Sequence, residues 1–434
     1  MNLLRRCCLV GVVPLGLVGV MAGIALNRPE VWQPAAVTAA VALALGLGAY
    51  AGVKGYQYTA WILAAVVAAM VYPGAFVRWG DLDLRNKWVV LVVVQLVMFG
   101  MGTQMSLRDF VGVMKMPWGV IVAVGSQFLI MPLSGWALTR LFSLPDEIAA
   151  GVILIGCCSS GLASNVMCFI AKANLALSIT ATAITTLIAP IMTPLWMKVL
   201  AGRLVDVRFT PMMVEIIKIV IVPIGAALLH DYLKTASARA RRNVVIGAGV
   251  AAVGVGFVAL GGVERLGLAV GESGRLGWEV FGFACGAVVF GVIYHGVTRW
   301  LPSLDRIMPL LSMAGIVYFT TVTTAAGRNH LLLVGGVLIL VAMLHNAAGY
   351  LFGYWLARAG GLDTASCRTV AIEVGLQTGG MASGLAGAMG KLATVGLAAA
   401  VFSPWMNISG SILANTWRRR TEQALKTSGA PGAE

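Results

Sequence analysis

The sequence predicts an all-α, polytopic membrane protein, because it is too apolar for a soluble domain and its apolar residues form long, repeated runs. Of its 434 residues, 59% are apolar and only 11% are charged, and the mean hydropathy is +0.89. A soluble domain averages about 45–50% apolar and about 25% charged residues. A helix that spans a bilayer needs about 20 mostly apolar residues, and such stretches recur along almost the whole chain. One membrane domain is therefore predicted.

About fourteen membrane-spanning segments can be placed by their length and apolarity. Two of them contain glycines and polar residues at mid-length, and the segment at 147–171 is predicted to be broken internally. The predicted segments run approximately over residues 8–26, 32–53, 58–77, 88–105, 118–142, 147–171, 176–200, 211–229, 244–262, 277–297, 308–326, 331–356, 366–388 and 393–416.

The charges between these segments predict how the chain crosses the membrane. The net charge of +14 comes from short basic runs, which are typical of cytoplasmic loops and do not indicate nucleic-acid binding. We expect an even number of spans, both termini in the cytoplasm, and an uncleaved first helix in place of a signal peptide. The loops predicted to be cytoplasmic contain Lys234, Arg239, Arg241, Arg242 and Arg418 to Arg420, and those predicted outside contain Asp81, Asp83, Asp146, Glu147, Glu264 and Glu272.

The sequence does not indicate an enzyme or an organic cofactor. Residues 384–391 resemble a phosphate-binding loop, but no Ser or Thr follows Lys391 and no strand is predicted before them. The seven cysteines lie mostly within apolar segments and lack the spacing of a zinc site or a disulfide framework. We expect Cys157, Cys158 and Cys168 to be small buried apolar residues.

The first cluster of polar residues within an apolar segment is GCCSSGLASN, at 156–165. Its glycines and small residues favour an unwound backbone. Ser164 and Asn165 could supply oxygen ligands there, and Ser178 and Thr182 follow one turn apart on the next segment. Polar groups inside a bilayer are functional candidates by default, because they cost several kcal/mol unless they are paired or hydrated. The hydroxyls could also simply bond neighbouring helices.

The second cluster is EVGLQTGG, at 373–380. Glu373 is the only carboxylate that we place near the centre of a span, and the glycines after it weaken the helix. Broken helices bring free carbonyl oxygens to the middle of the bilayer, where they suit a hard cation such as sodium. Two such segments, one in each half of the chain, predict inverted repeats that cross at a binding site at the midplane.

Several motifs together closely resemble the bile acid:sodium symporter family. The similarity covers about residues 58–229 and 308–417. The motifs are MFGMG (98–102), SQFLIMP (126–132), GCCSSGLASNVM (156–167), ALSITAT (176–182), IAPIMTPLWMKVLAG (188–202), LHNAAGY (344–350), EVGLQTGG (373–380) and FSPWMNISGSILA (402–414).

The resemblance implies a core of ten helices in two inverted repeats, with two broken helices that cross, and a panel domain against which the core moves. This chain departs from that pattern by about four extra helices, which we expect to enlarge the panel or form an oligomer surface. The implied divisions are 1–57 (two extra N-terminal helices), 58–229 (the first repeat and the start of the second), 230–303 (an inserted pair), 304–417 (the rest of the second repeat) and 418–434 (a basic cytoplasmic tail).

The resemblance also implies two sodium sites that share Glu373. Val374 and Leu376 would act through their backbone carbonyls, although the family often has methionine at the Leu376 position. The first site would comprise Ser164, Asn165, Ser178, Thr182 and Glu373, and the second would comprise Gln127, Glu373, Val374, Leu376 and Gln377.

The substrate crevice is expected beside the crossing, at Leu162, Ala163, Thr378 and Gly379. Here the chain departs from the family, which often has Pro-Gly-Gly-Thr at 159–162 and Asn at 378. These changes put bile acids themselves in doubt as substrates. We expect a small organic anion, because two helix N-termini with partial positive charge meet at the crossing.

The sequence as a whole therefore predicts a sodium-coupled symporter of a small organic anion, bile-acid-like or another carboxylate. Sodium is the expected coupling ion, and the lipid bilayer, the anion and a second copy of the chain are the expected partners. The resemblance to bacterial family members implies the inner (cytoplasmic) membrane. Two alternative functions are a proton-coupled exporter and a membrane sensor on the same scaffold. The exporter would keep Glu373 without needing the other oxygen ligands, and the sensor would need a signalling domain.

Overall fold

The computed structural model describes residues 2–50, 56–262 and 271–427, and these form an all-α protein. The only strands among them are β1 (Arg78–Trp79) and β2 (Leu82–Asp83), which form a small antiparallel hairpin. Within these ranges, ten helices are long and apolar enough to cross a membrane. The fold class predicted from composition is thus confirmed. The predicted end of the second segment at residue 53, the position of Glu264 and the last tail residues, 428–434, lie outside the described ranges.

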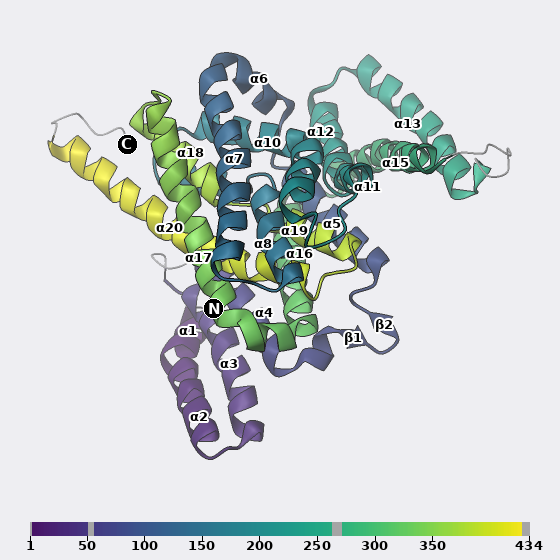
Figure 1. Ribbon diagram of the computed structural model, residues 1–434. Coiled ribbons are helices and arrows are strands. Elements are labelled where there is room, and N and C mark those ends of the chain that lie inside the picture. Colours follow the sequence, from purple (N-terminus) through teal and green to yellow (C-terminus); the bar gives the residue numbers. More distant parts are fainter. Residues whose placement is uncertain (1, 51–55, 263–270, 428–434) are drawn as a thin grey trace.

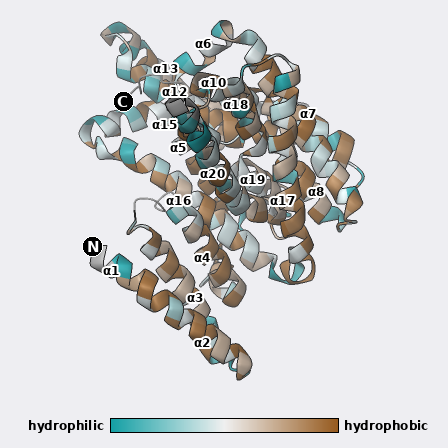
Figure 2. Ribbon diagram, turned by 90° about the vertical axis from the view of Figure 1, so that its left-hand side faces the viewer, coloured by the Kyte–Doolittle hydropathy of each residue, from teal (hydrophilic) through white to brown (hydrophobic). Residues whose placement is uncertain are grey.

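Three helices at the N-terminus pack in sequence and lead into the core. A first helical stretch, made of α1 (Asn2–Cys7), η1 (Cys8–Val12) and α2 (Val13–Ala25), packs against α3 (Pro29–Leu47). In turn α3 packs against α4 (Gln57–Val71), through buried alanines such as Ala44 and Ala60. In Figure 1, α1, α2 and α3 extend away from the other helices, and Figure 2 shows apolar residues along the length of α2 and α3. This exposed apolar surface suits lipid.

The first half of the core continues with α5, α7, the broken pair α8 and α9, and α10. Between α5 and α7 lies α6, a short helix that the apolar pattern did not predict. Its Asp109 carbonyl accepts a hydrogen bond from Thr180 of α10, at 3.1 Å. The bounds are η3 (Pro73–Phe76), α5 (Lys87–Gly102), α6 (Leu107–Lys115), α7 (Pro117–Leu141), α8 (Asp146–Cys157), α9 (Ala163–Ile170), α10 (Leu175–Trp196) and η4 (Met197–Ala201).

The second half repeats this order. A helix made of three parts leads to α13 and α15, the pair predicted to be an insertion, and then come α16, α17, the broken pair α18 and α19, and the long α20. The bounds are α11 (Phe209–Ile216), η5 (Ile217–Ile221), α12 (Val222–Thr235), α13 (Ala238–Ala259), α15 (Glu272–Trp300), α16 (Ser303–Ala326), α17 (Arg328–Ala359), α18 (Thr364–Gly375), α19 (Gly379–Ala388) and α20 (Val395–Thr427).

Each predicted spanning segment coincides with one of these helices or broken pairs. Twelve are continuous, namely the ten long helices and the shorter apolar helices α4 and α5. The other two are broken, α8 with α9 and α18 with α19. The boundaries differ at some ends. For example, α4 ends at Val71, before Pro73, and α20 continues to Thr427 through the basic residues of the predicted tail.

The two broken helices cross each other at their breaks. The backbone amide of Gly161 donates to the carbonyl of Leu376 at 2.8 Å, and that of Thr378 donates to Ser159 at 2.9 Å. Ser160 and Gln377 form an isolated antiparallel bridge. Backbone groups freed by a broken helix need partners in a membrane interior, and here the two breaks satisfy each other. The crossing predicted from the two glycine-rich segments is therefore present.

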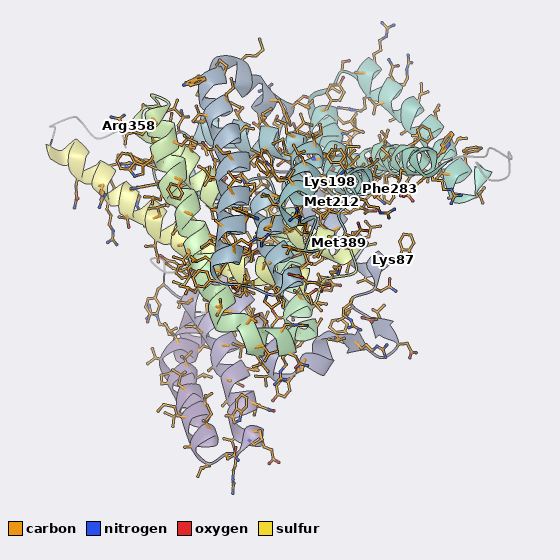
Figure 3. The ribbon with its side chains drawn as sticks, in the orientation of Figure 1. Lys87, Lys198, Met212, Phe283, Arg358 and Met389 are labelled. Carbon is orange, nitrogen blue, oxygen red and sulfur yellow. The ribbon has the colours of Figure 1, made fainter. Side chains whose placement is uncertain are left out.

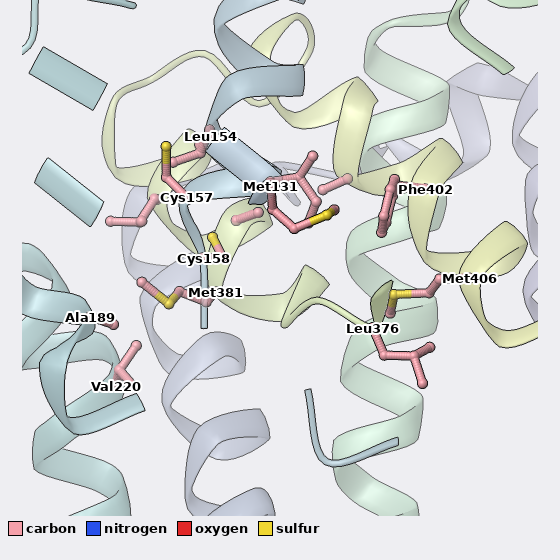
Figure 4. Packing of buried hydrophobic residues seen from close by; sticks show 14 of the residues in the cluster. Met131, Leu154, Cys157, Cys158, Ala189, Val220, Leu376, Met381, Phe402 and Met406 are labelled. Atoms are coloured by element: carbon pink, nitrogen blue, oxygen red, sulfur yellow. The ribbon is translucent and has the colours of Figure 1, made fainter. Parts of the chain in front are cut away.

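The crossing is enclosed by the largest apolar cluster of the protein. Cys157 and Cys158 are fully buried within it, as predicted, together with Met131, Leu376 and Phe402. Figure 4 shows these side chains around the broken helices. The helices next to the breaks pack in the same way in both halves, since α8 packs on α7 and α20 while α18 packs on α17 and α10. The breaks are therefore held on all sides.

The inserted helices lie on the opposite side of the molecule from α17, α18 and α20 (Figure 1). Here α15 packs against α13 and α12. Near the end of α15, the Tyr294 hydroxyl donates to Asp305 of α16 at 2.9 Å. Asp305 also contacts His230 and Lys234 of α12, at 3.2 and 3.0 Å. This network joins the insertion to the helices that precede and follow it.

Gly161→Ala tests whether the two breaks support each other. A Cβ at Gly161 would lie 2.7 Å from the Gln377 carbonyl oxygen, so the two unwound segments at the crossing would have to separate. We expect a loss of stability of about 1–3 kcal/mol, seen as a lower melting temperature of the purified protein. Gly249→Ala in α13 is the matched control, because no atom lies within 4 Å of a Cβ there. If the two variants melted alike, the close crossing would not contribute to stability.

Candidate functional site

Glu373 lies in α18, in the last turn before the break, and its side chain is buried among hydroxyl groups. Among the described residues it is the only acidic side chain that is buried, with 1% exposure. Ser178 of α10 donates a short hydrogen bond to Oε1, and Thr182, one turn later, donates to Oε2 at 2.8 Å. None of the ion pairs of the described residues includes Glu373. Its charge, when present, therefore has no basic side chain as a partner.

The other residues of the predicted first site meet at the same point. Asn165 Oδ1 of α9 lies 2.8 Å from the Ser178 hydroxyl and 3.4 Å from the Thr182 hydroxyl. The Ser164 and Thr182 hydroxyls lie 3.3 Å apart. Ser164 and Ser178 are fully buried, whereas Asn165 is half-buried. The structure thus brings together all five residues, from α9, α10 and α18.

Part of the predicted second site converges on the other side of the crossing. The Gln127 amide of α7 donates to Gln377 Oε1 at 2.7 Å and to the Cys158 carbonyl at 2.9 Å. The Gln377 amide donates to the Val374 carbonyl at 2.7 Å. Gln127 Oε1 is buried and has no hydrogen-bond partner among the described residues. A buried acceptor without a partner costs about 1–3 kcal/mol, so this oxygen is a candidate ligand.

Two predicted members of the second site are placed differently. The Leu376 carbonyl already accepts a hydrogen bond from the Gly161 amide at 2.8 Å, and the Ser160 hydroxyl lies 3.3 Å from it. The carboxylate of Glu373 faces Ser178 and Thr182, whereas the backbone carbonyl of Glu373 accepts a hydrogen bond from the Ser160 hydroxyl at 2.9 Å. The structure therefore gathers Gln127, Gln377 and the Val374 carbonyl, and links Glu373 to them through the backbone.

The chemistry of these groups suits a hard monovalent cation. The donor atoms are carboxylate, amide, hydroxyl and carbonyl oxygens, and the described residues contain no cluster of His, Cys, Asp or Glu that could hold a transition metal. An isolated ionised carboxylate in a low-dielectric interior costs several kcal/mol, which a bound cation would offset. In transporters, unwound carbonyls at crossing helices coordinate sodium or protons. The first oxygen set is the more complete of the two.

The predicted substrate residues lie at the start of the two half-helices. Leu162 lies directly before α9 and Ala163 is the first residue of α9, and both are half-buried. Thr378 lies directly before α19 and Gly379 is the first residue of α19, and both are buried. The Thr378 hydroxyl donates to the Ser160 carbonyl at 2.7 Å, so it is used within the crossing. Both helix N-termini are therefore at the crossing, where their partial positive charge favours an anion.

Asn346 of α17 is a positioning residue that the sequence reasoning did not assign. Its amide nitrogen donates to the Gly375 carbonyl at 2.8 Å, at the end of α18, and its oxygen accepts from Ser409 of α20 at 2.6 Å. The side chain is 1% exposed. It therefore fixes the backbone two residues after Glu373. An amide in the middle of an apolar span, in the motif LHNAAGY, was the signal that could have identified it.

A buried lysine with two carboxylates was also missed. Lys218 lies inside a predicted span, is 8% exposed, and contacts Glu215 at 2.6 Å and Glu279 of the inserted α15 at 3.0 Å. These residues line a cavity of about 500 Å³ between α5, α11, α15 and α19. Figure 3 labels Lys87 and Phe283, which line the same cavity. The predicted substrate residues do not line it, but it reaches α19 at Gly384.

Comparison with known proteins points to a single protein family. The model described as the Sodium Bile acid symporter family matches residues 91–266. The uncharacterized sodium-dependent transporter YocS of Bacillus subtilis is 30% identical over 373 residues, which are 85% of this chain and 93% of that protein. A probable chloroplastic sodium/metabolite cotransporter of Arabidopsis thaliana, BASS1, is 28% identical over 367 residues, which are 84% of this chain and 74% of that protein.

A human protein is also similar to this chain, at a lower identity. The human ileal sodium/bile acid cotransporter is 27% identical over 295 residues, which cover 67% of this chain and 66% of the human protein. Taken with the long match to the Bacillus protein and the crossed, broken helices, these similarities establish the family. The chain belongs to the sodium bile acid symporter family.

Proposed function

We propose that this protein is a secondary active symporter that uses a sodium gradient to drive uptake of a small organic anion. The observation that carries the proposal is the buried Glu373, whose carboxylate contacts hydroxyls from α10 and has no basic partner in the described ranges. Sodium bound beside Glu373 would neutralise this charge. The names of the relatives, which all refer to sodium-dependent transport or cotransport, support the same reading.

The geometry suggests how sodium binding would favour the anion. A cation held between Asn165 of α9 and Glu373 of α18 would fix the two broken helices relative to each other. The N-termini of α9 and α19 start from the same crossing, so their dipoles would be held in place for an anionic substrate. Each ligand would then stabilise the arrangement that the other binds, which is thermodynamic coupling.

A proton-coupled exporter is the second candidate, because protonation would also neutralise Glu373. It accounts less well for the rest of the site. A proton needs a single acceptor, whereas Asn165, Gln127 and the Val374 carbonyl place further oxygens around the crossing. The loop charges favour both termini in the cytoplasm. In a bacterial inner membrane, where the sodium gradient is directed inward, symport would carry the substrate into the cell.

Glu373→Gln is the most direct test of the site by mutation. It keeps the side-chain volume and removes the negative charge that would balance the charge of bound sodium. We expect sodium-driven uptake of organic anions into proteoliposomes to be lost, while the protein still inserts and elutes as a monodisperse peak. Glu422→Gln, at the exposed end of α20, is the matched control and retains uptake. Sodium-dependent uptake by Glu373→Gln at the rate of the wild type would refute the assignment.

Asn165→Ala and Gln127→Ala separate the two oxygen sets. Each removes one candidate ligand, worth about 1–3 kcal/mol, so we expect the sodium concentration for half-maximal transport to rise at least about fivefold. The affinity for the anion at saturating sodium changes less. Asn415→Ala is the control, because among the described residues the Asn415 amide bonds only to Ser411 of its own helix, at 2.8 Å. If the sodium titration of either variant matches that of the control, the substituted residue contributes to packing and does not bind sodium.

Leu162→Thr combined with Thr378→Asn tests the substrate crevice. The pair restores polar groups that are common in the family, and a site with hydrogen-bonding groups discriminates more strongly than an apolar contact worth about 1–3 kcal/mol. We expect the double variant to prefer more polar organic acids, with unchanged sodium dependence. The measurement is competition by a panel of organic acids against a labelled substrate. An identical rank order in both proteins would place the substrate elsewhere.

A further inference from the structure

A groove of about 920 Å³ lies on the outer face of the core, between α17, α18 and α20. Its long wall is one stripe of α17, with Leu344, Leu351 and Trp355. Its other wall is a stripe of α20, which includes Leu413 and Trp417. The exposed fractions of Leu351 and Trp355 are 54% and 61%, so the groove opens to the surroundings of the helix bundle. For a protein in a bilayer these surroundings are lipid.

Two guanidinium groups lie at one end of this groove. Arg368 of α18 donates to the Thr421 hydroxyl at 2.6 Å and lies 5.7 Å from the centre of the Trp417 ring. Arg420, one turn after Trp417, is exposed. Among the described residues neither arginine forms an ion pair, and the nearby Glu422 instead contacts Lys172 and Arg418. The groove therefore has two positive charges that no acidic side chain balances.

The charges and the apolar wall are arranged along the direction of the helices. The arginine end coincides with the end of α17 at Ala359 and the start of α18 at Thr364. Figure 3 labels Arg358 at this end of α17. Leu344 lies about 22 Å further along α17, at 1.5 Å per residue. Tyr354, Trp355 and Trp417 lie next to the arginines, where aromatic residues are enriched at the membrane–water interface.

We propose that this groove binds an anionic phospholipid, with its phosphate at Arg368 and Arg420 and an acyl chain along α17. Arginine pairs with phosphate through two parallel hydrogen bonds, and basic pockets between transmembrane helices bind anionic headgroups. A free organic anion would leave the apolar wall unused. A second copy of the chain would bring the same two positive charges and supply no phosphate. The site would anchor the core half of the bundle to the leaflet that contains its arginines.

The test is the thermal stability of the purified, delipidated full chain in neutral detergent. We expect phosphatidylglycerol to raise the melting temperature by several degrees, and phosphatidylcholine with the same acyl chains to have a much smaller effect. Arg368→Gln with Arg420→Gln abolishes the difference between the two lipids. Arg418→Gln with Arg419→Gln removes the same amount of charge, from residues of α20 that do not line the groove, and preserves that difference. Arg420→Gln alone, at an exposed position, reduces it even if the double variant does not fold.

Other occupants of the groove give distinct outcomes. An unchanged lipid difference in the Arg420→Gln variant would overturn the proposal. So would an equal shift with inorganic phosphate, which would indicate a site for free anions. Light scattering tests the remaining occupant, a second copy of the chain. A fall in oligomeric mass in the groove variants would assign the groove to contact between two copies and overturn the lipid proposal. Sodium-driven transport is not measured in this experiment. Failure of the lipid-site proposal can therefore be distinguished from failure of the proposed transport function.

Discussion

The carboxylate of Glu373 is 1% exposed in the interior of a helix bundle and has no basic partner among the described residues. An uncompensated charge at such a position costs several kcal/mol, so the protein can hold it only with a bound cation or a proton. The surrounding structure is arranged around this requirement. Two hydroxyls of α10 contact the carboxylate, Asn165 of α9 contacts the same two hydroxyls, and the carboxylate lies in the last turn before the break of α18. Packing elsewhere serves to hold these three elements together.

The crossing of the broken helices connects this charge to the rest of the molecule. Freed backbone groups of one break bond those of the other, so neither half-helix can shift without disturbing its counterpart. Asn346 extends the restraint to α17 and α20, because it contacts both the end of α18 and Ser409. In the proposed mechanism, occupancy of the cation site would be transmitted to the N-termini of α9 and α19 through these short, direct contacts. This arrangement gives sodium a physical route to influence anion binding.

The sequence could predict most of the fold, because hydropathy and segment length determine where helices cross a membrane. It also located both breaks and Glu373, since glycines and ionisable groups are conspicuous in apolar segments. It could not place Lys218, whose partner Glu279 is contributed by an inserted helix 61 residues later. Nor could it show that the Leu376 carbonyl is already bonded to the Gly161 amide, because such pairing depends on the three-dimensional register of the crossing. The short α6 was missed because its nine residues are too few to resemble a span.

Equilibrium binding of radioactive sodium to the purified wild-type protein tests the central claim most directly. If Glu373 is an ionised ligand, binding is saturable, is displaced by unlabelled sodium but not by potassium, and weakens as protons compete at low pH. Binding is measured in the absence of any organic anion, so the result does not depend on knowing the substrate. The account predicts saturable sodium binding at neutral pH that Glu373→Gln removes. The absence of saturable binding in the wild type, together with proton-driven anion transport, would contradict it.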